Sequence, residues 1–487
     1  MNSENNRTDA ADQVAPRTAR TTSRRSFLRT GAALGAATAL SVTASGLLAP
    51  SAAAEETTPY DVIVIGAGYA GITAARDLGV QGYRVLVLEA RDRIGGRTWT
   101  DTFAGHTVEM GGTWVDPVTM PNVGAEMARY NIGIVEDQAP EVTFLPTPTG
   151  PQEFSPATGF GNLGTVYAQI FDGSQQYFER PYEPLYSPLI TAKDQLSLRA
   201  RLNQMGLTPE QELLVNGQTA VYSGGSSSTG ALTMLAQWWA LAGHNSTGWN
   251  NTMRWRMAGG TAALLNAMLA QAQPVLRLSS PVTSVTKSST NSHFYVTTQG
   301  GRSYHARGVV VAAPANVWKT ITFSPALPAA QTAATTQGIA VPTGTKLWIN
   351  ARSPKGRFYA QGKEGGSPIT MVIPDKPTAE GHLFIAFSTD PNLDPTNTAQ
   401  VRAAIQQLGV DLDIVSVKAH KWGSDPYARG GWAFRKPGQL TSLYPDVTQP
   451  TGRLTFASGD IANGWSGYID GAIESGKRAA QQVVIGI

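Results

Sequence analysis

A lysine within an apolar run is the first residue that could do chemistry. Lys346 lies in the strand-like stretch 344–350, among large apolar residues that would bury its amine. Burial lowers the pKa of a lysine, and an amine that titrates near neutral pH suits proton transfer. The alternative is a solvated lysine on an edge strand, which the local pattern allows equally well.

A glycine-rich turn could bind a dinucleotide. An apolar run of strand length ends at Gly66, Gly68 and Gly71 follow before a helix-like stretch, and a second apolar run ends at Glu89. Gly66 permits a tight turn, Gly68 lets backbone N–H groups approach the pyrophosphate, and Gly71 lets the helix pack close to the strand. Glu89 would accept hydrogen bonds from the ribose hydroxyls. The pattern predicts a nucleotide site and leaves both FAD and NAD open.

Secondary-structure elements must position these residues. Apolar runs and alternating patterns predict strands, while glycine-rich or Ser/Thr-rich starts predict helices. Strands are expected at 60–65, 84–88, 281–285, 294–298 and 308–313, and helices from 72, after the capping cluster 226–229, after 257–260 and from about 468.

The composition excludes several function classes. The chain has 487 residues, of which 41% are hydrophobic and 15% charged, so it is too apolar to be disordered. The net charge of +3 comes from the first 54 residues, and the neutral remainder offers no basic surface for nucleic acid. The chain has no cysteine, which excludes disulfides, thiol catalysis and a cysteinyl-linked cofactor, and the spacing of its six histidines favours no metal site.

The first 54 residues have the pattern of an export signal. Arg24 and Arg25 stand just before Phe27, and residues 30–54 carry no charge. This pattern is typical of a twin-arginine leader with a cleavage site after Ala54, and the alternative is an uncleaved N-terminal anchor. No later stretch reaches the roughly 18 uninterrupted apolar residues of a membrane span. We therefore expect a secreted or periplasmic protein with no stable membrane span after processing.

Two further motifs decide between the nucleotides. The stretch 89–98 resembles the extension that follows the acidic residue in flavoproteins with two dinucleotide-binding domains, and 452–480 adds a matching C-terminal segment. Together with the glycine-rich turn, these motifs resemble the flavin-containing monoamine oxidase family over nearly the whole chain after the leader. The pattern, including 135–137, is most similar to bacterial nicotine oxidoreductases and their relatives. The resemblance implies FAD.

The same resemblance implies the fold. It is an α/β fold of the amine oxidase type, in which a Rossmann-like FAD domain with two dinucleotide-binding motifs is interleaved with an α+β substrate domain. The expected FAD-binding parts are 55–110, 251–335 and 431–487. The substrate domain is expected to take 111–250 and 336–430.

The resemblance also implies the residues that hold FAD. They come from the glycine-rich turn, the extension after Glu89, the second FAD-binding part and the C-terminal segment, where the helix from about Tyr468 would direct its N-terminal amides at the flavin. The expected cofactor residues are Gly66, Gly68, Ala70, Gly71, Glu89, Ala90, Arg91, Gly96, Arg97, Val282, Trp422, Gly459, Asp460, Tyr468 and Ile469. Because the chain has no cysteine, the FAD is expected to be bound non-covalently.

Three residues are implied as catalytic. In the family, a lysine at the position of Lys346 holds a water against flavin N5, and two aromatic walls at the positions of Trp432 and Tyr468 face the flavin. Paired aromatic faces attract an amine and exclude water. At the position of Tyr468, nicotine oxidoreductases carry asparagine, whereas monoamine oxidases carry tyrosine as this chain does. This difference argues against nicotine itself as the substrate.

The substrate pocket is expected to be aromatic. Tyr222 and Trp348 join Trp432 and Tyr468 as expected substrate contacts, and the pair 238–239 adds two more tryptophans. Asp116 would either cap a turn before Pro117 or pair with a substrate cation, and the first interpretation is favoured.

The implied function is an FAD-dependent amine oxidase. Hydride transfer from an aromatic or heterocyclic amine to flavin N5 would give an iminium that hydrolyses to a carbonyl, and O2 or another acceptor would reoxidise the flavin, with H2O2 formed from O2. One alternative is an L-amino acid oxidase of the same fold, which would need a pocket arginine. Another is a non-catalytic flavin-binding protein. No nucleic acid partner is expected, and a homodimer is one candidate assembly.

Overall fold

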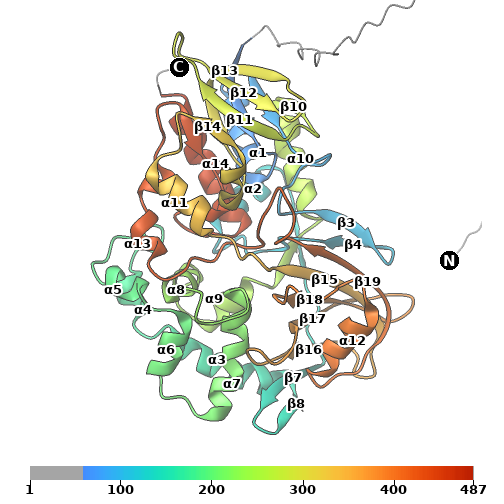
Figure 1. Cartoon of the computed structure of the whole chain (residues 1–487). Coiled ribbons are helices and arrows are strands. Elements are labelled where there is room, and N and C mark those ends of the chain that lie inside the picture. The colour runs from blue at the N-terminus through green and yellow to red at the C-terminus, as the bar shows by residue number, and fades with distance from the viewer. Residues whose placement is uncertain (1–58, 486–487) are drawn as a thin grey trace, which may run out of the picture. The chain divides into compact units, whose positions relative to one another are not determined.

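The computed structural model describes residues 59–485 (Figure 1), so the predicted export signal at 1–54 lies outside the described residues. Contacts join the described residues into one compact unit. Between residues 59 and 485, no helix combines the length and the apolar character that crossing a membrane requires.

The first sheet takes eight strands from three separated stretches of chain. They are β1 (Tyr60–Ile65), β2 (Val85–Leu88), β10 (Val275–Arg277), β11 (Val282–Lys287), β12 (Phe294–Thr298), β13 (Ser303–Val311), β14 (Thr322–Ser324) and β20 (Leu454–Phe456). The order is β10-β2-β1-β13-β12-β11-β14, with β20 paired to the second half of β13. Strands β10, β2, β1, β13 and β20 run parallel, and their apolar residues are mostly buried, as expected where helices cover both faces.

The predicted strands of this sheet agree with the structure to within about two residues, except at the start of β13. The predictions at 60–65 and 294–298 coincide with β1 and β12. Strand β13 begins at Ser303, earlier than the predicted 308, because its first residues alternate between buried and half-exposed positions opposite β12. An apolar run therefore marks only the half of β13 that is buried on both faces.

Three helices pack beside this sheet, with α1 in the middle. They are α1 (Tyr69–Val80), α10 (Thr261–Ala272) and α14 (Ile469–Val483), and α1 contacts both of the others (Figure 1). A Cβ on Gly71 would lie 2.0 Å from the carbonyl oxygen of Gly66, and one on Gly476 would lie 2.4 Å from that of Ala70. Glycine at these two positions lets the backbones approach each other, which is the close packing predicted for Gly71.

The second sheet has seven strands and carries Lys346. They are β7 (Val142–Thr147), β8 (Gly150–Phe154), β15 (Thr345–Arg352), β16 (Phe358–Gln361), β17 (Ile369–Pro377), β18 (His382–Ser388) and β19 (Asp413–Lys421), in the order β19-β15-β18-β17-β16-β7-β8. Strand β15 lies inside the sheet, antiparallel to both β18 and β19. The alternative of a lysine on an edge strand is therefore wrong.

The two sheets draw on different parts of the chain. The first takes its strands from within 55–110, 251–335 and 431–487, and the second takes its strands from within 111–250 and 336–430. A small sheet crosses these boundaries, since β9 (Trp255–Met257) pairs with β5 (Trp114–Val115) and β6 (Ile134–Glu136). The domain boundaries themselves stay a prediction.

The remaining helices pack on both sheets and on their connections. Helices α3 (Pro156–Ile170) and α7 (Pro209–Tyr222) pack on β7, α12 (Thr398–Gln406) packs on β17 and β19, and α2 (Pro121–Arg129) packs on α14 (Figure 1). The other elements are α4 (Ser174–Tyr177), α5 (Ile190–Asp194), α6 (Leu198–Gln204), α8 (Leu232–Leu241), α9 (Ser246–Asn251), α11 (Ala329–Gln337), α13 (Gln439–Leu443), the 3-10 helices η1 (Ala315–Thr320), η2 (Asp446–Thr448) and η3 (Gly459–Ile461), and a hairpin of β3 (Thr100–Phe103) and β4 (His106–Glu109).

One sequence-based helix start is wrong. The cluster 226–229 does not cap α8, which begins after Ala231 with no side-chain cap. The hydroxyl of Thr229 instead donates to the carbonyl oxygen of Ser223, and Ser227 donates to Glu364. The hydroxyls therefore stabilise the turn between α7 and α8, which is the other common use of such residues.

A buried ion pair connects α1 to α2. The guanidinium of Arg76 donates to both carboxylate oxygens of Glu126, at 2.7 and 2.8 Å, and Glu126 is completely buried. Lys477 of α14 approaches the same carboxylate at 3.3 Å. Burial would raise the pKa of Glu126, but the hydrogen bonds and charge of Arg76 outweigh burial and hold it below its usual value.

We expect Glu126→Gln to lower the free energy of unfolding by about 2–4 kcal/mol, because it leaves the buried Arg76 with only the partly exposed Asp77 as a counter-charge. Urea unfolding followed by tryptophan fluorescence measures the change. The matched control is Asp413→Asn, which breaks the exposed pair with Arg352 and should cost less than about 1 kcal/mol. Equal losses in both variants would contradict the prediction.

Candidate active site

One cavity of about 490 Å³ extends from the first sheet to the second. Its first part is lined by the glycine-rich turn and by residues that follow β2 and β13, and its other part by α7, α8 and strands of the second sheet. All the expected cofactor residues line it except Gly71 and Asp460. The volume lies in the range of small-molecule and cofactor sites.

The nucleotide end is preorganised by Glu89. One oxygen of this buried carboxylate accepts a hydrogen bond from the backbone N–H of Ala67 at 2.7 Å, and the other accepts from that of Arg91 at 2.9 Å. The glycine-rich turn and the loop after β2 therefore both donate to the same carboxylate, which lines the cavity. The extension after Glu89 packs on the turn, where Gly68 and Gly95 form an isolated bridge.

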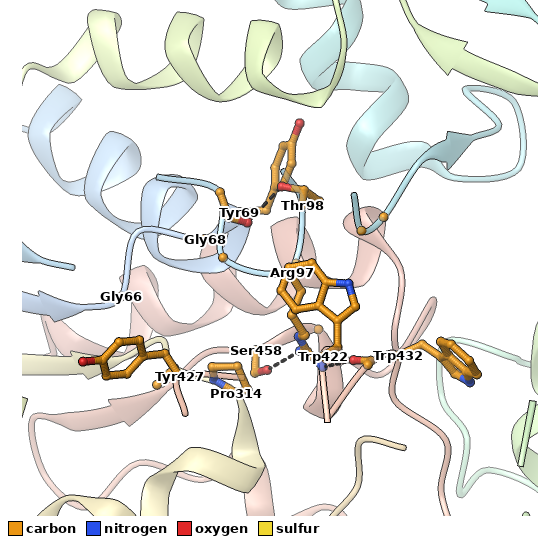
Figure 2. Close-up of a pocket in the computed structure, with 18 of the residues that line it drawn as sticks. Gly66, Gly68, Tyr69, Arg97, Thr98, Pro314, Trp422, Tyr427, Trp432 and Ser458 are labelled. Atoms are coloured by element: carbon orange, nitrogen blue, oxygen red, sulfur yellow. Dashed lines mark hydrogen bonds between the residues drawn. The ribbon is translucent and has the colours of Figure 1, made fainter. Parts of the chain in front are cut away.

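Arg97 brings positive charge into the cavity. Its guanidinium donates to the carbonyl oxygen of Gly431 at 2.9 Å and forms an ion pair with the buried Asp460 at 2.7 Å. The hydroxyl of Ser458 lies 3.5 Å from the same guanidinium (Figure 2). Asp460 does not line the cavity; it holds Arg97 from behind and also accepts from the backbone N–H of Ala315.

Two helix N-termini meet the cavity without side-chain caps. Gly68 precedes α1 and Tyr468 precedes α14, and neither supplies a capping side chain. Their first-turn amides therefore suit an anionic ligand, and so does the positive end of each helix dipole. With Glu89 for a ribose and Arg97 for a phosphate, these donors and acceptors fit FAD.

Lys346 is buried at the other end of the cavity. Its amine donates to the carbonyl oxygen of Gly111 at 2.9 Å and makes a short hydrogen bond to the hydroxyl of Thr113. Only 3% of the residue is exposed. Because a neutral amine has two N–H groups and one lone pair, these two contacts leave the lone pair for a water or a substrate.

Burial lowers the pKa of Lys346 to about 7, and the nearby charge of Arg256 adds to this decrease. Glu109, Asp137 and Asp375 oppose the shift. A lysine that titrates near neutral pH can take up and release protons under ordinary conditions. This is the property that the apolar setting of Lys346 predicts.

Trp432 and Tyr468 both line the cavity and are braced by other rings. The ring of Trp432 lies 6.2 Å from that of Phe387, and its indole N–H donates to the carbonyl oxygen of Tyr222 at 2.9 Å. The ring of Tyr468 lies 5.1 Å from Trp238 and 4.9 Å from Trp465, both in edge-to-face contact. Burial raises the pKa of Tyr468 well above its usual value, so its phenol stays neutral.

The structure does not bring all the expected substrate residues to the cavity. Tyr222 and Trp238 line it, but Trp348 and Trp239 do not. Trp348 shares the Lys346 face of β15 but donates its indole N–H to the carbonyl oxygen of Glu109 and packs behind the lysine. Trp239 stacks on Phe171 at 4.7 Å. Large aromatic residues in these positions form core instead of substrate contacts.

Asp116 caps a turn, as the favoured interpretation predicts. One carboxylate oxygen accepts from the backbone N–H of Val118 at 3.0 Å, and the other accepts from the hydroxyl of Thr119 at 2.7 Å. The residue is fully buried and does not line the cavity.

Sequence reasoning missed several lining residues. Met371 of β17 and Phe387 of β18 line the cavity on the Lys346 face, because Lys346 pairs with Phe387 and Phe387 with Met371 in register. The signal for them is the pairing of β15, β18 and β17, which local patterns do not reveal. Trp114, also missed, follows the glycine pair that ends at Gly112. In the described part of the chain, no three His, Asp or Glu side chains gather as a metal ion would require.

Comparisons with known proteins agree on one family. The sequence profile described as flavin containing amine oxidoreductase matches residues 69–484. The chain is 35% identical to pseudooxynicotine dehydrogenase of Pseudomonas sp., over 95% of each chain. It is 34% identical to nicotine dehydrogenase of Pseudomonas putida, over 87% of this chain and 88% of the relative.

The fold is also that of a known structure. Wild-type putrescine oxidase bound to putrescine superposes with a TM-score of 0.73 over 88% of this chain and 99% of its own, at 22% identity. The predicted α/β fold of the amine oxidase type is therefore confirmed, as is FAD as the cofactor.

We expect Lys346→Met to bind FAD, because Lys346 lies away from the nucleotide end, and to slow flavin reduction or reoxidation by about 10- to 1000-fold. In the wild type, the rate of this step plotted against pH should show an ionisation near pH 7, because the lysine amine is neutral and can accept a proton only above that pH. The variant should lack this ionisation. Stopped-flow absorbance measures both. The control is Lys355→Met, which removes an exposed lysine. A wild-type profile in Lys346→Met would rule out this role.

Proposed function

We propose a specific reaction for this chain, which belongs to the flavin containing amine oxidoreductase family. The chain is an FAD-dependent oxidoreductase that acts on amines. In the proposed reaction, it oxidises a C–N bond of an aromatic or heterocyclic amine, and the iminium product hydrolyses to a carbonyl. Bound FAD supplies the redox chemistry, because its ring takes up the hydride that leaves the substrate carbon.

The observation that carries this proposal is that one cavity contains both a nucleotide end and Lys346 with its aromatic walls. Glu89, Arg97 and the N-termini of α1 and α14 would hold FAD, with Ala70, Gly96, Val282, Gly459 and Ile469 in contact with it. Trp432 and Tyr468 would then enclose the amine and exclude water. Lys346 would hold a water or accept a proton with its lone pair.

The lining around Lys346 favours an apolar substrate. Tyr222, Trp238, Met253, Met371 and Phe387 line this part of the cavity, and none of them is charged. A diamine would need a carboxylate there, whereas the lining acid Glu89 is bonded within the nucleotide end. The names of the relatives, pseudooxynicotine and nicotine dehydrogenase, support a nicotine-related amine, and Tyr468 argues against nicotine itself.

An L-amino acid oxidase is the weaker alternative. It requires an arginine beside the substrate carboxylate. Three arginines line the cavity. Arg91 and Arg97 form ion pairs with Asp425 and Asp460 at 2.6 and 2.7 Å, and Arg429 is exposed on the loop that carries Asp425. All three lie near the nucleotide end.

A panel of amines tests the proposal. Anaerobic mixing with phenylalkyl, pyridylalkyl and diamine substrates should bleach the flavin fastest for the first two classes, and mixing the reduced protein with O2 should restore the colour and give H2O2. Tyr468→Ala should slow reduction by roughly 2- to 30-fold, the contribution of one cation–π wall.

The matched control for this variant is Tyr186→Ala, which removes a tyrosine that is exposed and lies outside the cavity lining. It should reduce its flavin at the wild-type rate. If no amine bleached the wild-type flavin, the protein would be a non-catalytic flavin-binding protein. If Tyr468→Ala and Tyr186→Ala behaved alike, Tyr468 would be a packing residue.

The proposal includes export through the twin-arginine pathway, followed by cleavage after Ala54, with a secreted or periplasmic location. Its support is the pair Arg24 and Arg25 before an uncharged stretch. The match to pseudooxynicotine dehydrogenase covers 95% of the chain and therefore extends into the first 58 residues. A homodimer remains one candidate assembly.

Replacing Arg24 and Arg25 by Lys should retain a folded, FAD-loaded precursor inside the cell, because the pathway reads the arginine pair and carries folded proteins. Cell fractionation with a flavin absorbance measurement checks this. Replacing Arg17 and Arg20 by Lys is the control and should not affect export. Normal export of the first variant would show that the leader is not of this type.

A further inference from the structure

A small sheet stands behind the Lys346 end of the cavity. Its middle strand β9 carries Arg256, which lies in register opposite Trp114 of β5 and Val135 of β6. Trp114 lines the cavity, whereas Arg256 does not. The sheet therefore connects a cavity wall to a charge behind that wall.

Arg256 is held by two acids. Its guanidinium lies 2.6 Å from one oxygen of Asp137 and donates to the other at 2.8 Å, and it pairs with Asp375 at 2.8 Å. The side chains of Arg256, Asp137 and Asp375 are 11%, 14% and 5% exposed. Asp137 also accepts from the indole N–H of Trp114 at 2.6 Å. One acid thus fixes both the arginine and the tryptophan.

Arg256 and Lys346 approach the same two indoles. The guanidinium carbon lies 6.0 Å from the ring of Trp114 and 5.7 Å from that of Trp348. The amine of Lys346 lies 5.3 and 5.6 Å from these rings. A second positive charge on Lys346 would therefore face the guanidinium across apolar rings, where water does not screen the repulsion.

We propose that Arg256 is a positioning residue for Lys346: with Asp137 it fixes Trp114 against the lysine, and its charge keeps the lysine amine available as a proton acceptor. This inference rests on the proposed function, in which Lys346 handles a proton beside the flavin. It assigns a role to Asp137, the last residue of the stretch 135–137.

Three acids around Lys346 oppose this effect, and each of them is also bound by another group. Glu109 of β4 is engaged by the backbone N–H and the hydroxyl of Thr261, and Asp137 and Asp375 are engaged by Arg256 itself. His420, in register with Lys346 on β19, is bonded to Asp425 at 2.9 Å.

The direction of the lysine pKa agrees. Arg256 lowers the pKa of Lys346 next after burial, and the three acids only oppose that decrease. The pKa of Asp137 is itself raised, because burial outweighs its contacts with Arg256 and Trp114.

The test compares pH profiles of anaerobic flavin reduction in four variants of the FAD-loaded protein. Arg256→Gln should move the ionisation that disappears in Lys346→Met upward by about one pH unit, and Asp375→Asn should move it downward, because it removes an acid that favours the charged lysine. Arg256→Lys keeps the charge and should stay near the wild-type position. The double variant Arg256→Gln with Lys346→Met should show no ionisation to move.

A second measurement does not depend on amine turnover. An unfolded lysine titrates near pH 10.4, so a folded pKa near 7 makes the unfolded state bind more protons between these values, and stability rises with pH in that window. The melting temperature of the wild type should therefore rise with pH relative to Lys346→Met. The same comparison is made between Arg256→Gln and the double variant Arg256→Gln with Lys346→Met. The rise in melting temperature with pH should be smaller for this pair than for the wild type and Lys346→Met.

The outcomes separate the two hypotheses. If no amine reduces the wild-type flavin, the proposed function fails, and the melting comparison still decides the role of Arg256. Arg256→Gln could lower the rate of flavin reduction at every pH and yet leave unchanged the pH dependence of both this rate and the melting temperature. Arg256 would then only support the fold, and the inference would be overturned. Should Arg256→Gln not fold, an unchanged or upward shift in Asp375→Asn would overturn it equally.

Discussion

The burial of one amine is the constraint on which the rest of the site depends. Lys346 lies on an interior strand, so its side chain cannot reach bulk water and must find partners within the protein. Those partners are a carbonyl oxygen and a hydroxyl, both neutral. Neutral partners satisfy the hydrogen bonds of the amine and stabilise its charge less than a carboxylate would, which suits an amine that exchanges protons.

The aromatic residues around this amine form a connected set whose members hold one another. Trp238 contacts Tyr222, Phe434 and Tyr468 edge-to-face, while Tyr222 and Phe434 are stacked. A ring that is fixed by several others cannot turn when a substrate enters. The cavity is therefore largely preformed, and little binding energy is lost to ordering its walls.

The sequence predicts the nucleotide end better than the substrate end. Gly66, Gly68, Gly71 and Glu89 are close together in the chain, and the backbone geometry of a turn depends on local residue types. The wall formed by Met371 and Phe387 depends on which strands pair, and that pairing is decided by the whole sheet. Trp348 illustrates the same limit, since an alternating pattern gives the face of a strand but not the depth of a side chain behind its neighbour.

The order in which the chain is synthesised gives the first sheet a further consequence. Strand β20 and helix α14 are made after the other strands of the first sheet, and they bring Gly459, Tyr468 and Ile469 to the cavity. A nascent chain that lacks these two elements therefore has only part of a cofactor cradle. Because contacts between distant segments form slowly, FAD capture belongs to the late steps of folding, after β20 and α14 have been made.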